Sequence, residues 1–210
     1  ENGISVTLHT GEKTLTKITN GIFVNEGGTL NIIGNGEIIT EVGNYNPLSK
    51  LITVNGTLNV TDATINNRGN ASVDWYAIYR QSGTVNIFDA TIKATTSSGA
   101  NRYMSGIAIG VKGGTALNIN GGEIYSESAN SVAISAVSNA DGNATGEINI
   151  TDGWIWAKET SSMAAIDIRR EGSYTNDVEL NITGGHVRSD NSDGIYIGEE
   201  IGRASCRERV

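Results

Sequence analysis

One short pattern of apolar and polar residues recurs along most of the chain. It runs aliphatic, asparagine, aliphatic, one or two polar residues, a turn pair, any residue and a final aliphatic. Six copies read LNIIGNGEI from Leu30, LNVTDATI from Leu58, VNIFDATI from Val85, LNINGGEI from Leu117, INITDGWI from Ile148 and LNITGGHV from Leu180. Their asparagines follow one another at intervals of 28, 27, 32, 31 and 32 residues. A period of this length is typical of a repeat architecture.

A second element of alternating apolar residues lies between successive copies of this phrase. It includes pairs such as Ile52/Val54, Tyr76/Ile78 and Ile107/Ile109. Each period therefore contains three short runs of alternating apolar and polar residues, separated by Gly, Asn, Asp and Ser. An alternation of two predicts β-strands, and no stretch sustains the spacing of a helix.

The repeat predicts an all-β fold, a right-handed parallel β-helix, which is a single-stranded β-solenoid. One coil of about 30 residues buries only about five aliphatic side chains, at roughly 1.5–3 kcal/mol each. Ordering its backbone costs roughly 1–2 kcal/mol per residue, so an isolated coil would unfold. Stacked coils share a core and backbone hydrogen bonds, and right-handed crossovers are preferred. We expect about six coils of 27–32 residues, each with three short strands, across residues 1–200.

Strand periodicity also predicts which side chains face outward. In Leu58-Asn59-Val60 the aliphatic residues face the core, so the asparagine between them faces outward. The equivalent asparagines are expected to stack in a structural ladder that holds the coils in register: Asn31, Asn59, Asn86, Asn118, Asn149 and Asn181. The same amides could instead form a hydrogen-bonding strip for a glycan.

The turn pairs fall at one equivalent corner of each coil, and some of them begin with aspartate. Asp62 and Asp89 lie on adjacent coils and should be about 4.8 Å apart, the spacing of neighbouring strands. Two carboxylates at that distance could bind Ca²⁺, the one cofactor that the sequence suggests. Formation of a tight turn is the simpler explanation, because Asp and Gly favour left-handed backbone.

The most distinctive surface pattern is aromatic. In Trp154-Ile155-Trp156 the isoleucine faces inward, so both tryptophans face outward. Alignment of the repeats places Glu123, Trp154 and His186 in one outer column, and Tyr125, Trp156 and Arg188 in the next. Such a platform of flat rings and polar groups suits stacking on the apolar face of a sugar. The alternative is an aromatic ladder that stabilises strand pairing or is covered by a long loop, such as Ser138 to Gly146.

Composition and charge narrow the possible partners. Residues 201–210, IGRASCRERV, resemble the translation of a sequencing adapter, and we expect them to be non-native and outside the fold. This tail holds three arginines, one glutamate and the only cysteine, Cys206, so its removal changes the net charge from −8 to −10. An acidic chain without a basic stripe is poorly suited to nucleic acid or an anionic membrane. The sequence has no apolar run of about 18 residues, so it predicts no membrane span.

The repeated phrases resemble a known group of proteins. NIN-GG-x-I from Asn118 and NIT-GG-x-V from Asn181 look like the pectate-lyase-like β-helix repeats of bacterial surface and secreted proteins. The likeness covers about residues 20–198. It implies an extracellular or cell-surface location in a bacterium. Because this scaffold carries adhesin stalks, carbohydrate-binding modules, phage tailspikes, lyases and hydrolases, the resemblance is specific for fold and not for function.

No catalytic residues can be assigned from the sequence. The two histidines, His9 and His186, lie at opposite ends of the repeat array, and Arg169 and Arg170 form only a small basic spot near Asp167. We therefore expect a noncatalytic cell-surface or secreted solenoid, a stalk or adhesin that contacts polysaccharide or another cell-surface ligand. Both ends look truncated, so further coils of the same chain are expected there. The alternative is a segment of a polysaccharide lyase, glycoside hydrolase or phage tailspike whose active coils lie elsewhere.

Overall fold

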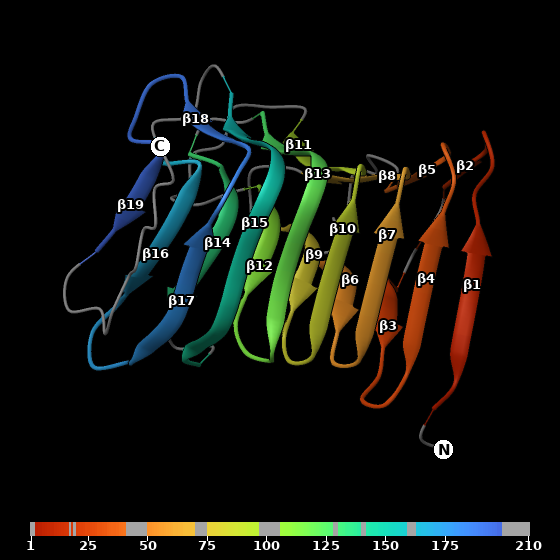
Figure 1. The fold of residues 1–210 in the computed structure, drawn as a ribbon, viewed down its shortest axis with the longest axis horizontal. Helices are drawn as coiled ribbons and strands as arrows, with labels where there is room; N and C mark the ends of the chain where they lie inside the picture. Colours follow the sequence, from red (N-terminus) through yellow and green to blue (C-terminus); the bar gives the residue numbers. More distant parts are fainter. Residues whose placement is uncertain are drawn as a thin grey trace.

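The computed structural model describes residues 3–16, 18, 20–40, 50–69, 75–96, 106–127, 130–139, 142–158 and 163–198. These residues form strands and turns, and none of them lies in a helix. All pairs of named strands in the two sheets are parallel. The coils follow one another along a single axis (Figure 1), which makes the chain a parallel β-solenoid of about five turns. The predicted class, an all-β parallel β-solenoid, is thereby confirmed, with about five turns where the sequence predicts about six coils.

Three rows of strands run along the solenoid. The seven-stranded sheet contains β3 (Ile22–Val24), β6 (Lys50–Val54), β9 (Tyr76–Arg80), β12 (Ile107–Val111), β14 (Val132–Ser138), β16 (Ile166–Arg170) and β19 (Ile195–Ile197). The Asn row contains β1 (Ser5–His9), β4 (Thr29–Ile33), β7 (Thr57–Thr61), β10 (Thr84–Phe88), the first parts of β13 (Ala116–Ser126) and β15 (Ala144–Ala157), and β17 (Asn176–Ile182). The third row contains β2 (Thr14–Leu15), β5 (Glu37–Ile39), β8 (Thr64–Gly69), β11 (Thr91–Thr96), the last parts of β13 and β15, and β18 (His186–Ser189).

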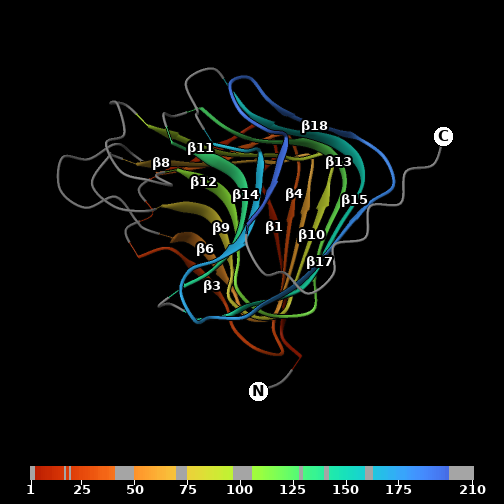
Figure 2. The same cartoon turned by 90° about the vertical axis from the view of Figure 1, so that its left-hand side faces the viewer.

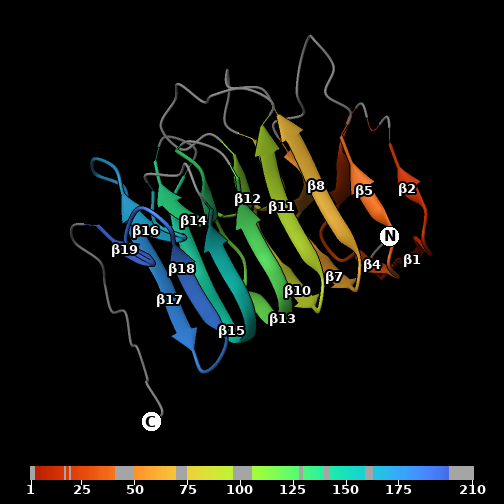
Figure 3. The same ribbon diagram turned by 90° about the horizontal axis from the view of Figure 1, so that it is seen from above.

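Equivalent residues of successive repeats pair directly. Leu58 pairs with Leu30 on one side and Val85 on the other, and Asn59 pairs with Asn31 in the same register. The end-on view shows the strand rows around a common interior (Figure 2), and Figure 3 shows the third row from above. Because the side-chain period is two, this register keeps every inward residue inward from coil to coil.

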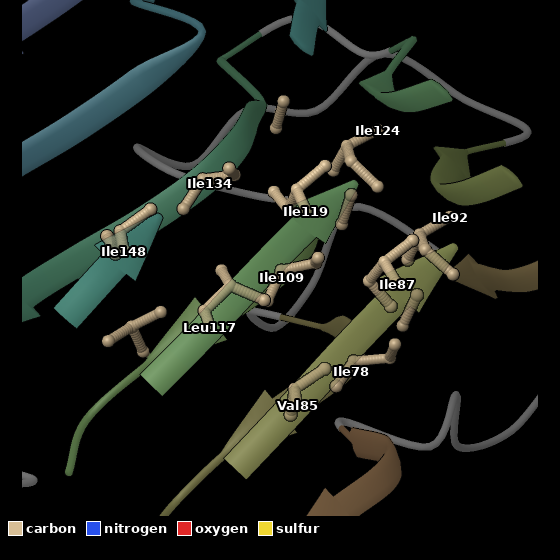
Figure 4. Packing of buried hydrophobic residues seen from close by; sticks show 14 of the residues in the cluster. Ile78, Val85, Ile87, Ile92, Ile109, Leu117, Ile119, Ile124, Ile134 and Ile148 are labelled. Atoms are coloured by element: carbon tan, nitrogen blue, oxygen red, sulfur yellow. The ribbon is translucent and has the colours of Figure 1, made fainter. Parts of the chain in front are cut away.

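The core is one continuous column of aliphatic side chains. Each coil contributes residues from all three rows, so that Ile78, Ile87 and Ile92 of one coil are all fully buried. Ile109 and Ile119 of the next coil pack in the same cluster (Figure 4). Burial of an aliphatic side chain contributes roughly 1.5–3 kcal/mol, and here most of it comes from contact between neighbouring coils.

The corner between the Asn row and the third row depends on left-handed backbone. Asp62 and Asp89 have φ values of 60° and 50°, and Gly121 and Gly153 have φ values of 121° and 101°. At Gly121 and Gly153 the strand continues through the corner, so β13 and β15 each span two rows with a register shift between them. The two strands predicted for these coils are therefore joined into one, because the corner bends without ending the ladder.

Tyr76 lies outside the core column, although the sequence pairs it with Ile78. The core takes the successive residues Ala77 and Ile78, as it takes Ala108 and Ile109 from the next coil. Tyr76 packs instead against a small outer cluster that includes Ile107 and Val137. The residue that enters the core column beside Ile78 is Arg80, which pairs with Val54 and Val111 and is fully buried.

Candidate functional site

The third row carries the aromatic columns that the sequence predicts. Glu123 pairs with Trp154, which pairs with His186, and Tyr125 pairs with Trp156, which pairs with Arg188. We call these six residues the outer strip. Their positions follow from two features of the sequence, the inward Ile155 that turns both tryptophans outward and the corner that starts each third-row segment at an equivalent residue.

Trp154 is the most open ring of the outer strip. The residue is 43% exposed, and its ring stacks on the His186 imidazole with centroids 4.3 Å apart and planes 23° apart. One face of the indole is thereby covered. The neighbouring coil on the other side contributes Glu123, an exposed residue in direct register. Trp154 thus combines an apolar surface with a nearby carboxylate, the two features that hold a sugar ring.

The rings of Tyr125 and Trp156 are less available than the sequence suggests. The Lys158 ammonium lies 3.5 Å from the centre of the Tyr125 ring and 4.7 Å from that of Trp156. Tyr125 is only 8% exposed. This burial, with smaller contributions from Glu127, Glu123 and Glu37, raises the pKa of Tyr125 to about 12. Tyr125 therefore cannot serve as an open platform, because a cation from the following coil folds over it.

Trp156 is fixed by polar contacts at its edge and by a second cation. Its indole Nε1 donates a hydrogen bond to Asp190 Oδ1 at 3.0 Å, and the same carboxylate oxygen forms an ion pair with Arg188 Nε at 2.9 Å. The Arg188 guanidinium lies 5.2 Å from the centre of the Trp156 ring. Trp156 and Arg188 are therefore held in place beside Trp154, and the open part of the outer strip centres on Trp154 and His186.

The six predicted asparagines form an unbroken hydrogen-bonded ladder. Each amide nitrogen donates to the amide oxygen of the preceding coil at 2.7–3.0 Å, through Asn59, Asn86, Asn118, Asn149 and Asn181. The first amide, that of Asn31, donates at 3.4 Å to the hydroxyls of Ser5 and Thr7. Since the interior members of the ladder use one donor and one acceptor on each other, the geometry supports a structural role more than a glycan-binding one.

Asp62 and Asp89 lie on adjacent coils at the same corner, as their sequence positions predict. Both are exposed and both have left-handed backbone. A Cβ added at Gly121 would collide with Oδ1 of Asp89, so this carboxylate occupies the space that the glycine leaves free. Among the described residues, no group of three His, Cys, Asp or Glu side chains could hold a metal ion. Ca²⁺ requires six to eight oxygen ligands, and the two aspartates by themselves supply too few.

Sequence reasoning missed the buried arginine. Arg80 Nη2 donates to the carbonyl of Thr145 at 2.8 Å, and Nη1 lies 3.4 Å from the carbonyl of Glu147. Burial lowers the pKa of Arg80 to about 10, against a smaller opposing effect of the Glu147 charge. The available signal was a charged residue at the position where the adjacent coils have Val54 and Val111.

A tyrosine pair on the outer face of the seven-stranded sheet was also not predicted. Tyr76 and Tyr79 meet edge to face with centroids 4.9 Å apart and border a hollow of about 110 Å³. A Cβ at Gly110 would lie 2.5 Å from Cδ1 of Tyr76, so the glycine makes room for the rings. The hollow is too small for a sugar ring, because small-molecule sites occupy roughly 300–1,000 Å³.

The described residues contain no helix long and apolar enough to cross a membrane. Comparisons of the chain with protein-family models, with curated proteins and with solved structures found no match.

Proposed function

We propose that this chain is a noncatalytic, pectate-lyase-like β-solenoid, secreted or displayed on a bacterial surface, which acts as a stalk or adhesin and contacts polysaccharide through the outer strip. The observation that carries this proposal is the exposed indole of Trp154, supported on one face by His186 and flanked by Glu123. An indole removes much apolar surface from water when a sugar ring covers it, and a carboxylate beside it can accept hydroxyl hydrogen bonds.

The charges around the outer strip favour a neutral glycan. Three cations, Lys93, Lys158 and Arg188, alternate with three carboxylates, Glu123, Glu127 and Asp190. The strip therefore presents no excess of positive charge, and the whole chain carries a net charge of −8. A polyanionic polysaccharide would be repelled at long range, whereas a neutral one would not.

The stacking of the coils supports a spacer role for the rest of the chain. Each coil contacts its neighbours through the shared core and the asparagine ladder, so stability accumulates from nearest-neighbour contacts along one axis. An array of this kind can hold a binding strip at a fixed distance from an attachment point. This is the property that a stalk or adhesin needs.

The proposal is tested by affinity electrophoresis in gels that contain neutral polysaccharides, such as a β-glucan or a mannan, or acidic ones, such as alginate. The matched pair of variants is Trp154→Ala and Phe88→Ala, because Phe88 is a similarly exposed ring, 41% against 43%, in the Asn row. We expect a neutral polysaccharide to retard the wild-type and Phe88→Ala proteins, and Trp154→Ala to migrate freely with unchanged circular dichroism. Equal retardation of both variants, or retardation only by the acidic polymer, would refute the proposal.

A further inference from the structure

A pocket of about 480 Å³ lies at the C-terminal end of the seven-stranded sheet, separate from the rings of the outer strip. Its lining includes Asn130, Met163, Asp167, Ser192, Asp193 and Tyr196. Asp167 lies in β16, and Tyr196 is its partner in β19. Ser192 and Asp193 belong to the turn that follows β18, so the pocket adjoins the point where the outer strip ends.

Asp167 is the unusual member of this lining. Its side chain is fully buried, and neither carboxylate oxygen has a hydrogen-bond partner. Arg169 Nε lies 3.5 Å from Oδ2, close enough for an ion pair but outside hydrogen-bonding geometry. A buried carboxylate without hydrogen bonds is costly, and a bound ligand or ion is one reason why native proteins retain such groups.

Burial and two neighbouring charges set the pKa of the Asp167 carboxyl. Burial raises its pKa to about 6, Arg169 opposes the shift, and Glu171 adds to it. Asp193 contributes a second, exposed carboxylate to the same pocket. The region is therefore acidic, and a bound cation would stabilise the ionised form of Asp167.

The volume of the pocket and the chemistry of its lining residues favour an organic cation over a metal ion as the ligand. A calcium ion needs six to eight oxygen ligands, and the described residues include no cluster of three acidic, histidine or cysteine side chains. The volume of about 480 Å³ lies instead within the range of small-molecule sites. Tyr196, which is 44% exposed, and Met163 supply apolar surface beside the carboxylates.

We propose that this pocket binds the protonated amine of an amino sugar. The ammonium group pairs with Asp193 at the exposed side of the pocket and reaches Asp167 when the neighbouring Tyr196 side chain moves aside. The sugar ring then packs against Tyr196 and Met163. The pocket does not require the outer strip to bind ligand, so it is a second and independent site.

The test is isothermal titration calorimetry of the full chain at neutral pH with a glucosamine tetrasaccharide. The N-acetylglucosamine tetrasaccharide, which lacks the charged amine, is the matched ligand, and calcium chloride is titrated separately. The variants are Asp167→Asn and Asp193→Asn, with Asp62→Asn as the control because its exposed aspartate lies at a distant corner. Trp154→Ala is included to separate this site from the outer strip.

We expect the amine-bearing tetrasaccharide to bind and its acetylated counterpart not to bind. Affinity should fall about fivefold in Asp193→Asn, as for an exposed ion pair, and about tenfold or more in Asp167→Asn, as for a buried one. Asp62→Asn and Trp154→Ala should bind like the wild type. Absence of binding, equal affinity for both tetrasaccharides, or unchanged affinity in both pocket variants would overturn the proposal. Calcium binding that disappears in Asp167→Asn, without amine binding, would overturn it in favour of a metal site.

Discussion

Replacement of Asp167 by asparagine should change how the stability of the protein depends on pH. The folded state raises the pKa of this carboxyl from its ordinary value of 3.8 to about 6, chiefly by burial. A raised carboxyl pKa means that the folded state favours the protonated form. The protonated Asp167 carboxyl therefore makes its full contribution to the stability of the folded state below about pH 3.8. This contribution is lost as the pH rises through about 6. The difference between a pKa of 3.8 and one of about 6 corresponds to roughly 3 kcal/mol of stability.

The asparagine variant cannot titrate, so its own burial cost is the same at every pH. The free energy of unfolding, variant minus wild type, should consequently be about 2 kcal/mol larger at about pH 7.5 than at about pH 4, where a small part of the contribution is already lost. Urea unfolding followed by circular dichroism at the two pH values measures this double difference, with Asp62→Asn as the exposed control. A double difference below about 0.5 kcal/mol, the usual size of a surface effect, would refute the reasoning.

Two further changes test the fold. Asn86→Ala removes the amide bonds to Asn59 and Asn118 and should lower the free energy of unfolding by about 1–3 kcal/mol. Thr84→Ala on the same strand should cost about 0.5 kcal/mol or less, and equal urea midpoints for the two variants would show that the ladder contributes nothing. Gly110→Ala should cost about 1–3 kcal/mol and weaken the tyrosine circular dichroism signal, because its Cβ would lie 2.5 Å from Tyr76. An unchanged signal would mean that the rings are not held there.

The elements that follow from local periodicity could be predicted from the sequence. Asn59 and its equivalents are outward because each stands between two aliphatic residues, and the constant interval between copies places them above one another. The orientation of Trp154 follows from the same alternation around Ile155. These features depend only on residues close together in the chain and on the repeat length, which are both visible in the sequence.

The contacts and the exposure of each ring in the outer strip could not be predicted in the same way. Alignment places Tyr125 and Trp154 in neighbouring columns, but it does not show that Lys158 covers one ring and that His186 stacks on the other. Long side chains such as lysine choose among many rotamers, so their contacts depend on the final surface and not on the period. The burial of Asp167 also escaped prediction, because the residues around it come from segments that are far apart in the sequence, such as Asn130 and Tyr196.

Three buried polar side chains donate hydrogen bonds to backbone carbonyl groups of other coils. A buried carbonyl group needs a donor, and here the acceptors lie in strands β14 and β15. Arg80 donates to Thr145, Lys112 donates to Val137 at 2.7 Å, and Asn176 donates to Ala136 at 2.7 Å. The later coils are therefore held together by specific polar side chains as well as by the aliphatic column, and their stability should be less tolerant of substitution at these positions than their repeat pattern suggests.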